Sequence, residues 1–273
     1  MGSYIKENYV KDKVIIITGA SSGFGKCAAV KAANMGAKVV LAARREERLA
    51  AVVEEIKKNG GKASYIKTDV RDFEQVKAMA KFAVDTYGRI DVLVNNAGTM
   101  PQSFYSDHCM DEWHQCIDTI VYGTLYGIDA VYDQMIKQGE GHIINVSSIM
   151  GNYATPGCGV YAAAKAAVRF MADSLRIEAN SRIKVTVVRP TGCTKTELFG
   201  TVVNLNASMA TLNAKVFDSF MPGGSGVKDR NSVEYNDIEP DDIADGIIYA
   251  INQPLGVDIG DITVRASGEK LFT

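Results

Sequence analysis

The feature that most constrains the fold is a run of β-branched residues that ends in a glycine-rich turn. Residues 14–17 read VIII, which predicts a strand buried on both faces. Gly19, Gly23 and Gly25 follow, and the next stretch, KCAAVKAANMGA, has helical periodicity. A glycine turn between a strand and a helix N-terminus lets bare backbone and unpaired amides approach a pyrophosphate. The sequence therefore predicts a dinucleotide-binding loop, with an ordinary strand-to-helix turn as the alternative.

Predicted strands and amphipathic helices alternate along the rest of the chain. We expect strands at 38–44, 63–70, 90–98, 142–148, 184–190 and 261–266, with helices at 46–60, 73–88 and 110–137 and another around residue 161. This order predicts an α/β fold of the Rossmann type, a doubly wound parallel sheet with helices on both faces. Residues 1–273 are expected to form one domain. The weakly patterned segment at about 197–238 is interpreted as a substrate lid inserted into that domain.

Composition argues against several classes of partner. The formal net charge of -2 gives no broad positive field, so we expect no nucleic-acid partner. The sequence has no apolar run of the roughly 18 to 20 residues that a membrane span requires. The five cysteines are an odd number at irregular spacings, which favours a reducing cytoplasm. They do not combine with the histidines into zinc-like spacing, so no metal is expected.

A second group of residues indicates proton transfer. Tyr161 and Lys165 are four residues apart in YAAAKAAVRF, which on a helix places the phenol and the ammonium on one face. The positive charge favours the phenolate, and a tyrosine must lose about three pK units to exchange protons usefully near neutrality. Ser148 precedes this pair by thirteen residues. Because Tyr-x-x-x-Lys also occurs by chance on solvated helices, the pair is informative only together with its neighbours.

Together these motifs resemble the short-chain dehydrogenase/reductase family. TGASSGFG at 18–25 is similar to its cofactor loop, NNAG at 95–98 is similar to its sheet-stabilising motif, and the serine, tyrosine and lysine are similar to its active site. The resemblance implies an oxidoreductase in which Tyr161 is the general acid/base and Ser148 hydrogen-bonds the substrate oxygen. Lys165 would lower the pKa of the tyrosine and hold the nicotinamide ribose.

The chain departs from the family pattern at Ile120. Relatives usually carry an asparagine there, whose carbonyl holds a water that connects the lysine to solvent and whose side chain pins a helix kink. Isoleucine keeps the carbonyl but loses the amide, so we expect a drier site with a weakened or rerouted proton relay. The alternative is a nucleotide-binding protein with impaired chemistry.

The end of the second predicted strand favours NADP(H). NAD-preferring enzymes place a carboxylate there for the ribose hydroxyls, whereas this chain has Ala43 followed by Arg44 and Arg45. Guanidinium groups suit a 2'-phosphate. We expect Arg44 to be the main contact. The alternative is that both arginines are solvated and paired with Glu46 and Glu47.

The resemblance also assigns residues at other strand ends to the cofactor. Asp69 is expected to bond the adenine amino group, and Thr196, with Thr194 as second choice, to lie near the nicotinamide carboxamide. The extra residue Thr191 between Pro190 and Gly192 leaves the register of that turn open. The full set of expected cofactor contacts is Gly19, Ser21, Ser22, Gly23, Phe24, Gly25, Arg44, Arg45, Asp69, Val70, Asn95, Ala97, Gly98, Tyr161, Lys165, Pro190, Gly192, Thr194 and Thr196.

Apolar residues near the expected site indicate the substrate class. Met150, Tyr153 and Phe199 favour a bulky hydrophobic ketone or secondary alcohol, and a steroid-like ring system would fit. A reductase of acyl-carrier thioesters and a non-catalytic NADP(H)-binding sensor remain the alternatives. The helix with Tyr161 and the long helix before it have the apolar content to pair between subunits, so we expect a homodimer or homotetramer.

Overall fold

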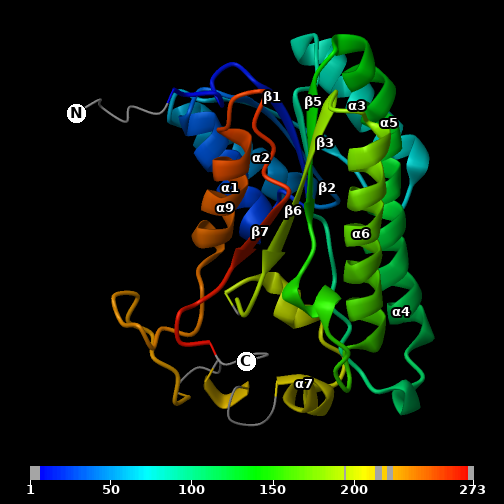
Figure 1. The fold of residues 1–273 in the computed structure, drawn as a ribbon, viewed down its shortest axis with the longest axis vertical. Coiled ribbons are helices and arrows are strands. Elements are labelled where there is room, and N and C mark those ends of the chain that lie inside the picture. The colour runs from blue at the N-terminus through cyan, green and yellow to red at the C-terminus, as the bar shows by residue number, and fades with distance from the viewer. Residues whose placement is uncertain (1–6, 194, 213–216, 220–223, 270–273) are drawn as a thin grey trace.

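A seven-stranded parallel sheet forms the centre of the molecule, in the order β3-β2-β1-β4-β5-β6-β7 (Figure 1). The structure is a computed structural model that describes residues 7–193, 195–212, 217–219 and 224–269. The predicted doubly wound α/β fold is confirmed. The strands are β1 (Val14–Thr18), β2 (Lys38–Ala43), β3 (Lys62–Lys67), β4 (Val92–Asn95), β5 (Gly141–Val146), β6 (Ile183–Pro190) and β7 (Asp261–Val264).

Helices cover both faces of this sheet. In Figure 1 the sheet is seen nearly edge-on, with α1, α2 and α9 on one side and α3, α5 and α6 on the other. Within the described residues, every helix is too short or too polar to cross a bilayer. The helices are α1 (Gly23–Asn34), α2 (Glu46–Lys58), α3 (Phe73–Tyr87), α4 (Met110–Ile117), α5 (Gly123–Gln138), α6 (Gly159–Glu178), α7 (Leu205–Leu212) and α9 (Pro240–Ile251).

The β-branched run of β1 explains why the sheet is buried on both faces. Ile15 and Ile17 point into the core beneath α1, α2 and α9, while Ile16 points into the core beneath α3, α5 and α6. All three side chains are at most 1% exposed. Burial of each contributes roughly 1.5 to 3 kcal/mol, so this central strand anchors both helical layers.

Two departures from regular structure lie near the carboxyl edge of the sheet. The predicted long helix at 110–137 is interrupted by a single π-helical segment, Asp118–Tyr122, between α4 and α5. The segment predicted as a lid contains the short 3₁₀ helix η4 (Glu197–Thr201) and α7. Figure 1 places α7 beyond the carboxyl ends of the strands, at the end of the molecule toward which β6 points. Parallel strands bring all their carboxyl-terminal loops to this edge, where ligands bind in folds of this type.

Candidate active site

A cavity of about 470 Å³ opens at the carboxyl edge of the sheet. Its wall is formed by the loops after β1, β2, β3, β4, β5 and β6 together with η4. Most residues predicted for the site meet here, although they come from distant parts of the chain. The predicted residues that line the cavity are Gly19, Ser21, Ser22, Gly23, Phe24, Arg44, Arg45, Asp69, Val70, Ala97, Gly98, Ser148, Met150, Tyr161, Lys165, Pro190, Gly192, Thr196 and Phe199.

Four predicted residues are not among those that line the cavity. Thr194 lies outside the described residues. Tyr153 is 41% exposed and outside the cavity wall. Gly25 lies behind the loop, and the side chain of Asn95 turns into the sheet, where its amide donates to the Asn145 side chain at 2.9 Å. Asn96, which was not predicted, lines the cavity in place of Asn95.

The glycine loop after β1 packs directly against the loop after β4. The backbone amides of Asn96 and Ala97 donate to the Thr18 hydroxyl at 3.0 and 3.2 Å, and the Asn96 side chain donates to the Thr18 carbonyl at 2.9 Å. A Cβ at Gly19 would lie 2.9 Å from the Ala97 Cα, and a Cβ at Gly25 would lie 2.6 Å from the Asn96 amide nitrogen. These glycines are therefore required because two loops approach closely, and Gly19 also has a positive φ of 66°.

The three residues predicted for proton transfer share one wall of the cavity. Ser148 follows β5, and Tyr161 and Lys165 lie one turn apart on α6. The Lys165 Nζ donates to the Val146 carbonyl at 2.8 Å, and the Ser147 hydroxyl donates to the Lys165 carbonyl at 2.7 Å. These bonds hold α6 against the end of β5. The Lys165 Nζ lies 5.8 Å from the centre of the Tyr161 ring.

Burial controls the electrostatics of this wall. It raises the pKa of the Tyr161 phenol, while a side-chain hydrogen bond with Ser148 acts in the opposite direction. It also lowers the pKa of Lys165 to about 8. The expectation that the lysine makes the tyrosine acidic is therefore not met in the protein alone. Burial disfavours the charged forms of both groups more strongly than the nearby ammonium favours the phenolate. The tyrosine is therefore a protonated phenol at neutral pH.

Ile120 packs within an apolar cluster beside the tyrosine. It is 1% exposed and shares this cluster with Cys116, Met150, Cys158 and Tyr161. Ile120 lies in the π-helical segment that interrupts the helix predicted at 110–137, so the helix is distorted here without an asparagine side chain to pin it. Gly123, the residue after this segment, lies so close to Val70 that a Cβ would approach the valine side chain to 2.8 Å. Close packing against the loop after β3 thus accompanies the π turn.

Several groups in the cavity have the character of a dinucleotide site. The Thr196 hydroxyl is buried and has no hydrogen-bond partner among the described residues. Thr196 is the residue predicted to lie near the nicotinamide carboxamide. Ser22 is the N-cap of α1 but makes no capping bond with its side chain, so the first amides of the helix stay available. An amide group and a pyrophosphate would satisfy these two sets of atoms, so the residues present fit a nicotinamide dinucleotide.

The turn after β6 lines the cavity with Thr191 as well as with Pro190 and Gly192. The Thr191 hydroxyl bonds to the carboxylate of Glu269, a buried residue of the C-terminal segment, and the Gly192 amide donates to the same carboxylate at 3.4 Å. The inserted threonine is thereby held by the C-terminal segment. Thr196 remains in the cavity wall.

The far end of the cavity carries charged groups around the loop after β2. The Arg45 guanidinium donates to Ser21 at 2.9 Å and to Ser22 at 3.0 Å. Glu197 of η4 approaches the same arginine at 2.7 Å. Asp69 is paired with Arg71 at 2.6 Å, and this contact lowers the pKa of its carboxyl.

Sequence reasoning missed Asn96 and Glu197. Asn96 lies within the strand predicted at 90–98 and directly follows β4 as observed, and the alternation of side chains along a strand could have shown that Asn95 and Asn96 face opposite ways. No sequence signal indicated Glu197, because its approach to Arg45 depends on how η4 folds over the cavity. Among the described residues, no three His, Cys, Asp or Glu side chains converge in the manner of metal ligands.

Comparison with known proteins agrees with this architecture. The sequence model of the short chain dehydrogenase family matches residues 13–206. An uncharacterized oxidoreductase of Staphylococcus saprophyticus is 40% identical over 97% of this chain and 100% of its own length. The cavity of this chain is bounded by a glycine loop and has a buried serine, tyrosine and lysine on one wall, an arrangement consistent with this family. The chain belongs to the short-chain dehydrogenase family.

Two solved structures show which cofactors similar proteins bind. A metagenomic short-chain oxidoreductase in complex with NADP is 28% identical, with a TM-score of 0.74 over 94% of this chain and 98% of that chain. A short chain dehydrogenase/reductase from Burkholderia phymatum in complex with NAD is 25% identical, with a TM-score of 0.75 over 93% of this chain and 89% of that chain. Both nicotinamide cofactors therefore occur among proteins of this fold.

Proposed function

We propose that this protein is an NADP(H)-dependent oxidoreductase that interconverts a bulky hydrophobic ketone and the corresponding secondary alcohol. The observation that carries the proposal is the placement of Ser148, Tyr161 and Lys165 on one wall of the cavity that begins at the glycine loop. A proton donor and a dinucleotide loop in one cavity are what carbonyl reduction requires.

Each residue on this wall has a distinct role in the proposal. Ser148 hydrogen-bonds the carbonyl oxygen, and Tyr161 donates its phenolic proton to that oxygen. Because burial raises its pKa, Tyr161 carries this proton at neutral pH, which suits the direction of reduction. The nicotinamide supplies the hydride when it is bound. Lys165, held on the Val146 carbonyl, provides positive charge beside the phenolate that remains.

The choice of NADP(H) is supported by the charges at the end of β2. The last residue of β2, Ala43, supplies no carboxylate of its own to bond the ribose hydroxyls, and Arg44 and Arg45 both line the cavity. Arg45 is already oriented by the Ser21 and Ser22 hydroxyls. Guanidinium and hydroxyl donors in one place suit a phosphate monoester.

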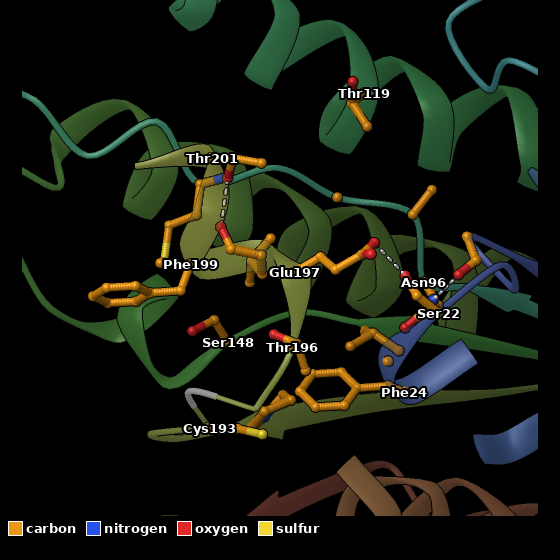
Figure 2. Close-up of a pocket in the computed structure, with 18 of the residues that line it drawn as sticks. Ser22, Phe24, Asn96, Thr119, Ser148, Cys193, Thr196, Glu197, Phe199 and Thr201 are labelled. Atoms are coloured by element: carbon orange, nitrogen blue, oxygen red, sulfur yellow. Dashed lines mark hydrogen bonds between the residues drawn. The ribbon is translucent and has the colours of Figure 1, made fainter. Parts of the chain in front are cut away.

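Apolar side chains near the catalytic wall support a hydrophobic substrate. Met100, Met150, Phe199 and Leu212 line this cavity, and the Phe199 ring lies 6.3 Å from that of Phe217. Phe199 and Leu212 belong to the segment at 197–238, which we propose acts as the substrate lid. Figure 2 shows Phe199 on the same side of the cavity as Ser148.

Cofactor oxidation with a substrate panel tests this proposal. We expect NADPH to be oxidised faster than NADH when a bicyclic or steroidal ketone is present, and faster with such ketones than with small ketones. Preference for an acyl thioester would support the ketoreductase alternative. Tight NADPH binding without turnover of any carbonyl would support a sensor.

We also propose that the protein assembles as a homodimer or homotetramer in the cytoplasm. Phe170 and Ile177 on α6 are 65% and 81% exposed, and Leu125 on α5 is 44% exposed. A second copy would bury these apolar side chains. The five cysteines are all free thiols, in keeping with a reducing compartment. Light scattering of the purified protein measures the number of subunits.

A further inference from the structure

A carboxylate occupies the anion-binding corner of the cavity. Glu197 accepts a hydrogen bond from the Ser22 hydroxyl at 2.9 Å and pairs with the Arg45 guanidinium at 2.7 Å. The Arg48 guanidinium bonds its other oxygen. Together these contacts lower the pKa of Glu197 to about 2. Two guanidinium groups and a hydroxyl thus surround one anionic group.

These donors are the ones that a phosphate monoester would use. Guanidinium groups bind phosphate and carboxylate oxygens in the same forked geometry. Ser22, Arg45 and Glu197 all line the cavity, on the side of the glycine loop. Ser22 also donates to Glu197 instead of capping α1. The carboxylate therefore competes directly for groups that the glycine loop and β2 supply.

Glu197 reaches this corner from the opposite side of the cavity. It begins η4, whose last residue, Thr201, accepts a hydrogen bond from the Met100 amide at 2.7 Å after β4. Figure 2 shows the Glu197 side chain extending away from Thr201 and Phe199 toward Ser22. The contact joins the loop after β6 to the loops after β1 and β2 across the cavity.

We propose that Glu197 determines cofactor selectivity as an internal counterion that the 2'-phosphate of NADP(H) must displace from Ser22, Arg45 and Arg48. The inference rests on the proposed preference for NADP(H). The carboxylate weakens phosphate binding relative to what the two arginines alone would provide. Displacement also breaks the contacts that Glu197 makes with Ser22 and Arg45 across the cavity.

The size of the effect follows from exposure. Glu197 and Arg45 are 48% and 45% exposed at their side chains. Ion pairs at this degree of exposure are screened by water and salt, so competition changes binding by a modest factor.

Binding of two nucleotides to Glu197→Gln tests the inference. Adenosine 2',5'-bisphosphate and 5'-AMP differ only in the 2'-phosphate and need no turnover, and calorimetry measures both. We expect the variant to bind the bisphosphate about fivefold more tightly than the parent, with 5'-AMP unchanged, and the gain to shrink at high salt. Glutamine preserves the size of the side chain, and circular dichroism confirms folding.

Glu46→Gln is the matched control. Glu46 adjoins Arg45 in sequence, is exposed, and has no hydrogen bond or ion pair among the described residues. The control removes the same charge nearby without touching the anion-binding corner, so its bisphosphate affinity should stay within twofold of the parent. The inference is overturned if Glu197→Gln binds the bisphosphate no more tightly than the parent, or if Glu46→Gln gains as much.

The parent protein reports on the cofactor separately. If the parent binds both nucleotides equally but Glu197→Gln prefers the bisphosphate, the counterion is real and the proposed NADP(H) preference is wrong. If neither protein prefers the bisphosphate, both proposals fail. If the parent prefers it and the variant gains nothing, only the role of Glu197 is lost.

Discussion

The two ends of the cavity differ in how far their ionisable side chains are exposed to solvent. At the catalytic end, Tyr161 and Lys165 are 4% and 5% exposed. Burial raises the pKa of the tyrosine and lowers the pKa of the lysine, which favours the neutral form of each. At the end near β2, the side chains of Arg45 and Glu197 are nearly half exposed to solvent and form an ion pair. We call the buried catalytic end dry and the solvent-exposed end near β2 wet, although both belong to a single cavity.

This difference in exposure predicts at which end of the cavity a single substitution has the larger effect. In a dry site a lost hydroxyl or ammonium leaves its partners unsatisfied, and no water replaces it. In a wet site, solvent and salt compensate for most of what a substitution removes. We therefore expect large, salt-insensitive effects at the catalytic end and small, salt-sensitive effects at the other.

Tyr161→Phe should have the largest effect. Loss of the phenolic proton donor is expected to reduce ketone turnover about 10²- to 10⁴-fold while NADPH still binds. Steady-state NADPH oxidation and cofactor fluorescence measure the two quantities. Tyr87→Phe, at the end of α3 and at the opposite edge of the sheet, is the control that should retain activity. Equal turnover in Tyr161→Phe and the parent would remove the tyrosine from the mechanism.

Lys165→Met should come next, with a loss of turnover of about 10²-fold. It should also change how stability depends on pH. The pKa of Lys165 is about 8 in the folded protein against an ordinary value of 10.5, so the unfolded chain binds more protons between these values. The contribution of Lys165 to the free energy of unfolding of the parent therefore rises as the pH increases from about 8 to 10.5. Denaturant unfolding across this range should show that the rise is smaller in Lys165→Met. The same slope in both proteins would mean that the ammonium is not desolvated.

Arg45→Gln tests the wet end. We expect NADPH affinity to fall about tenfold at low salt and NADH affinity to change little, because only the phosphate loses a charged partner. Arg182→Gln removes the same charge before β6, at the opposite edge of the sheet, and should leave both affinities unchanged. Titrations at two salt concentrations sharpen the contrast, since a loss that persists at high salt would make this end as dry as the other.

Thr196→Val should have the smallest effect, because the lost hydroxyl, although buried, leaves no protein group in the described part of the chain without a partner. Its hydroxyl has no partner among the described residues, so the free energy of unfolding should not fall. Affinity for NADPH should weaken about fivefold, as expected for one hydrogen bond to the nicotinamide amide. Adenosine 2',5'-bisphosphate lacks that amide and should bind both proteins equally. Weaker binding of the bisphosphate as well would place Thr196 elsewhere in the site.

Local patterns predicted much of the fold because their causes are local. The VIII run, the following glycines and the helical periodicity of residues 26–37 identified β1, its turn and α1. Helical spacing placed Tyr161 beside Lys165, whereas the family resemblance added Ser148, and all three line the cavity. Asn95, predicted to run beside the cofactor, does not line the cavity, because the last residue of β4 turns its side chain toward Asn145.

The order of strands and helices, the glycine turn and the spacing of the serine, tyrosine and lysine could all be read from the amino-acid sequence. These depend on backbone preference and on periodicity, which neighbouring residues set. The folded structure was needed to see that burial raises the pKa of Tyr161 despite the nearby lysine, and that Glu197 contacts Arg45 across the cavity. Desolvation and contact between distant segments depend on everything packed around a group, and no local pattern contains that information.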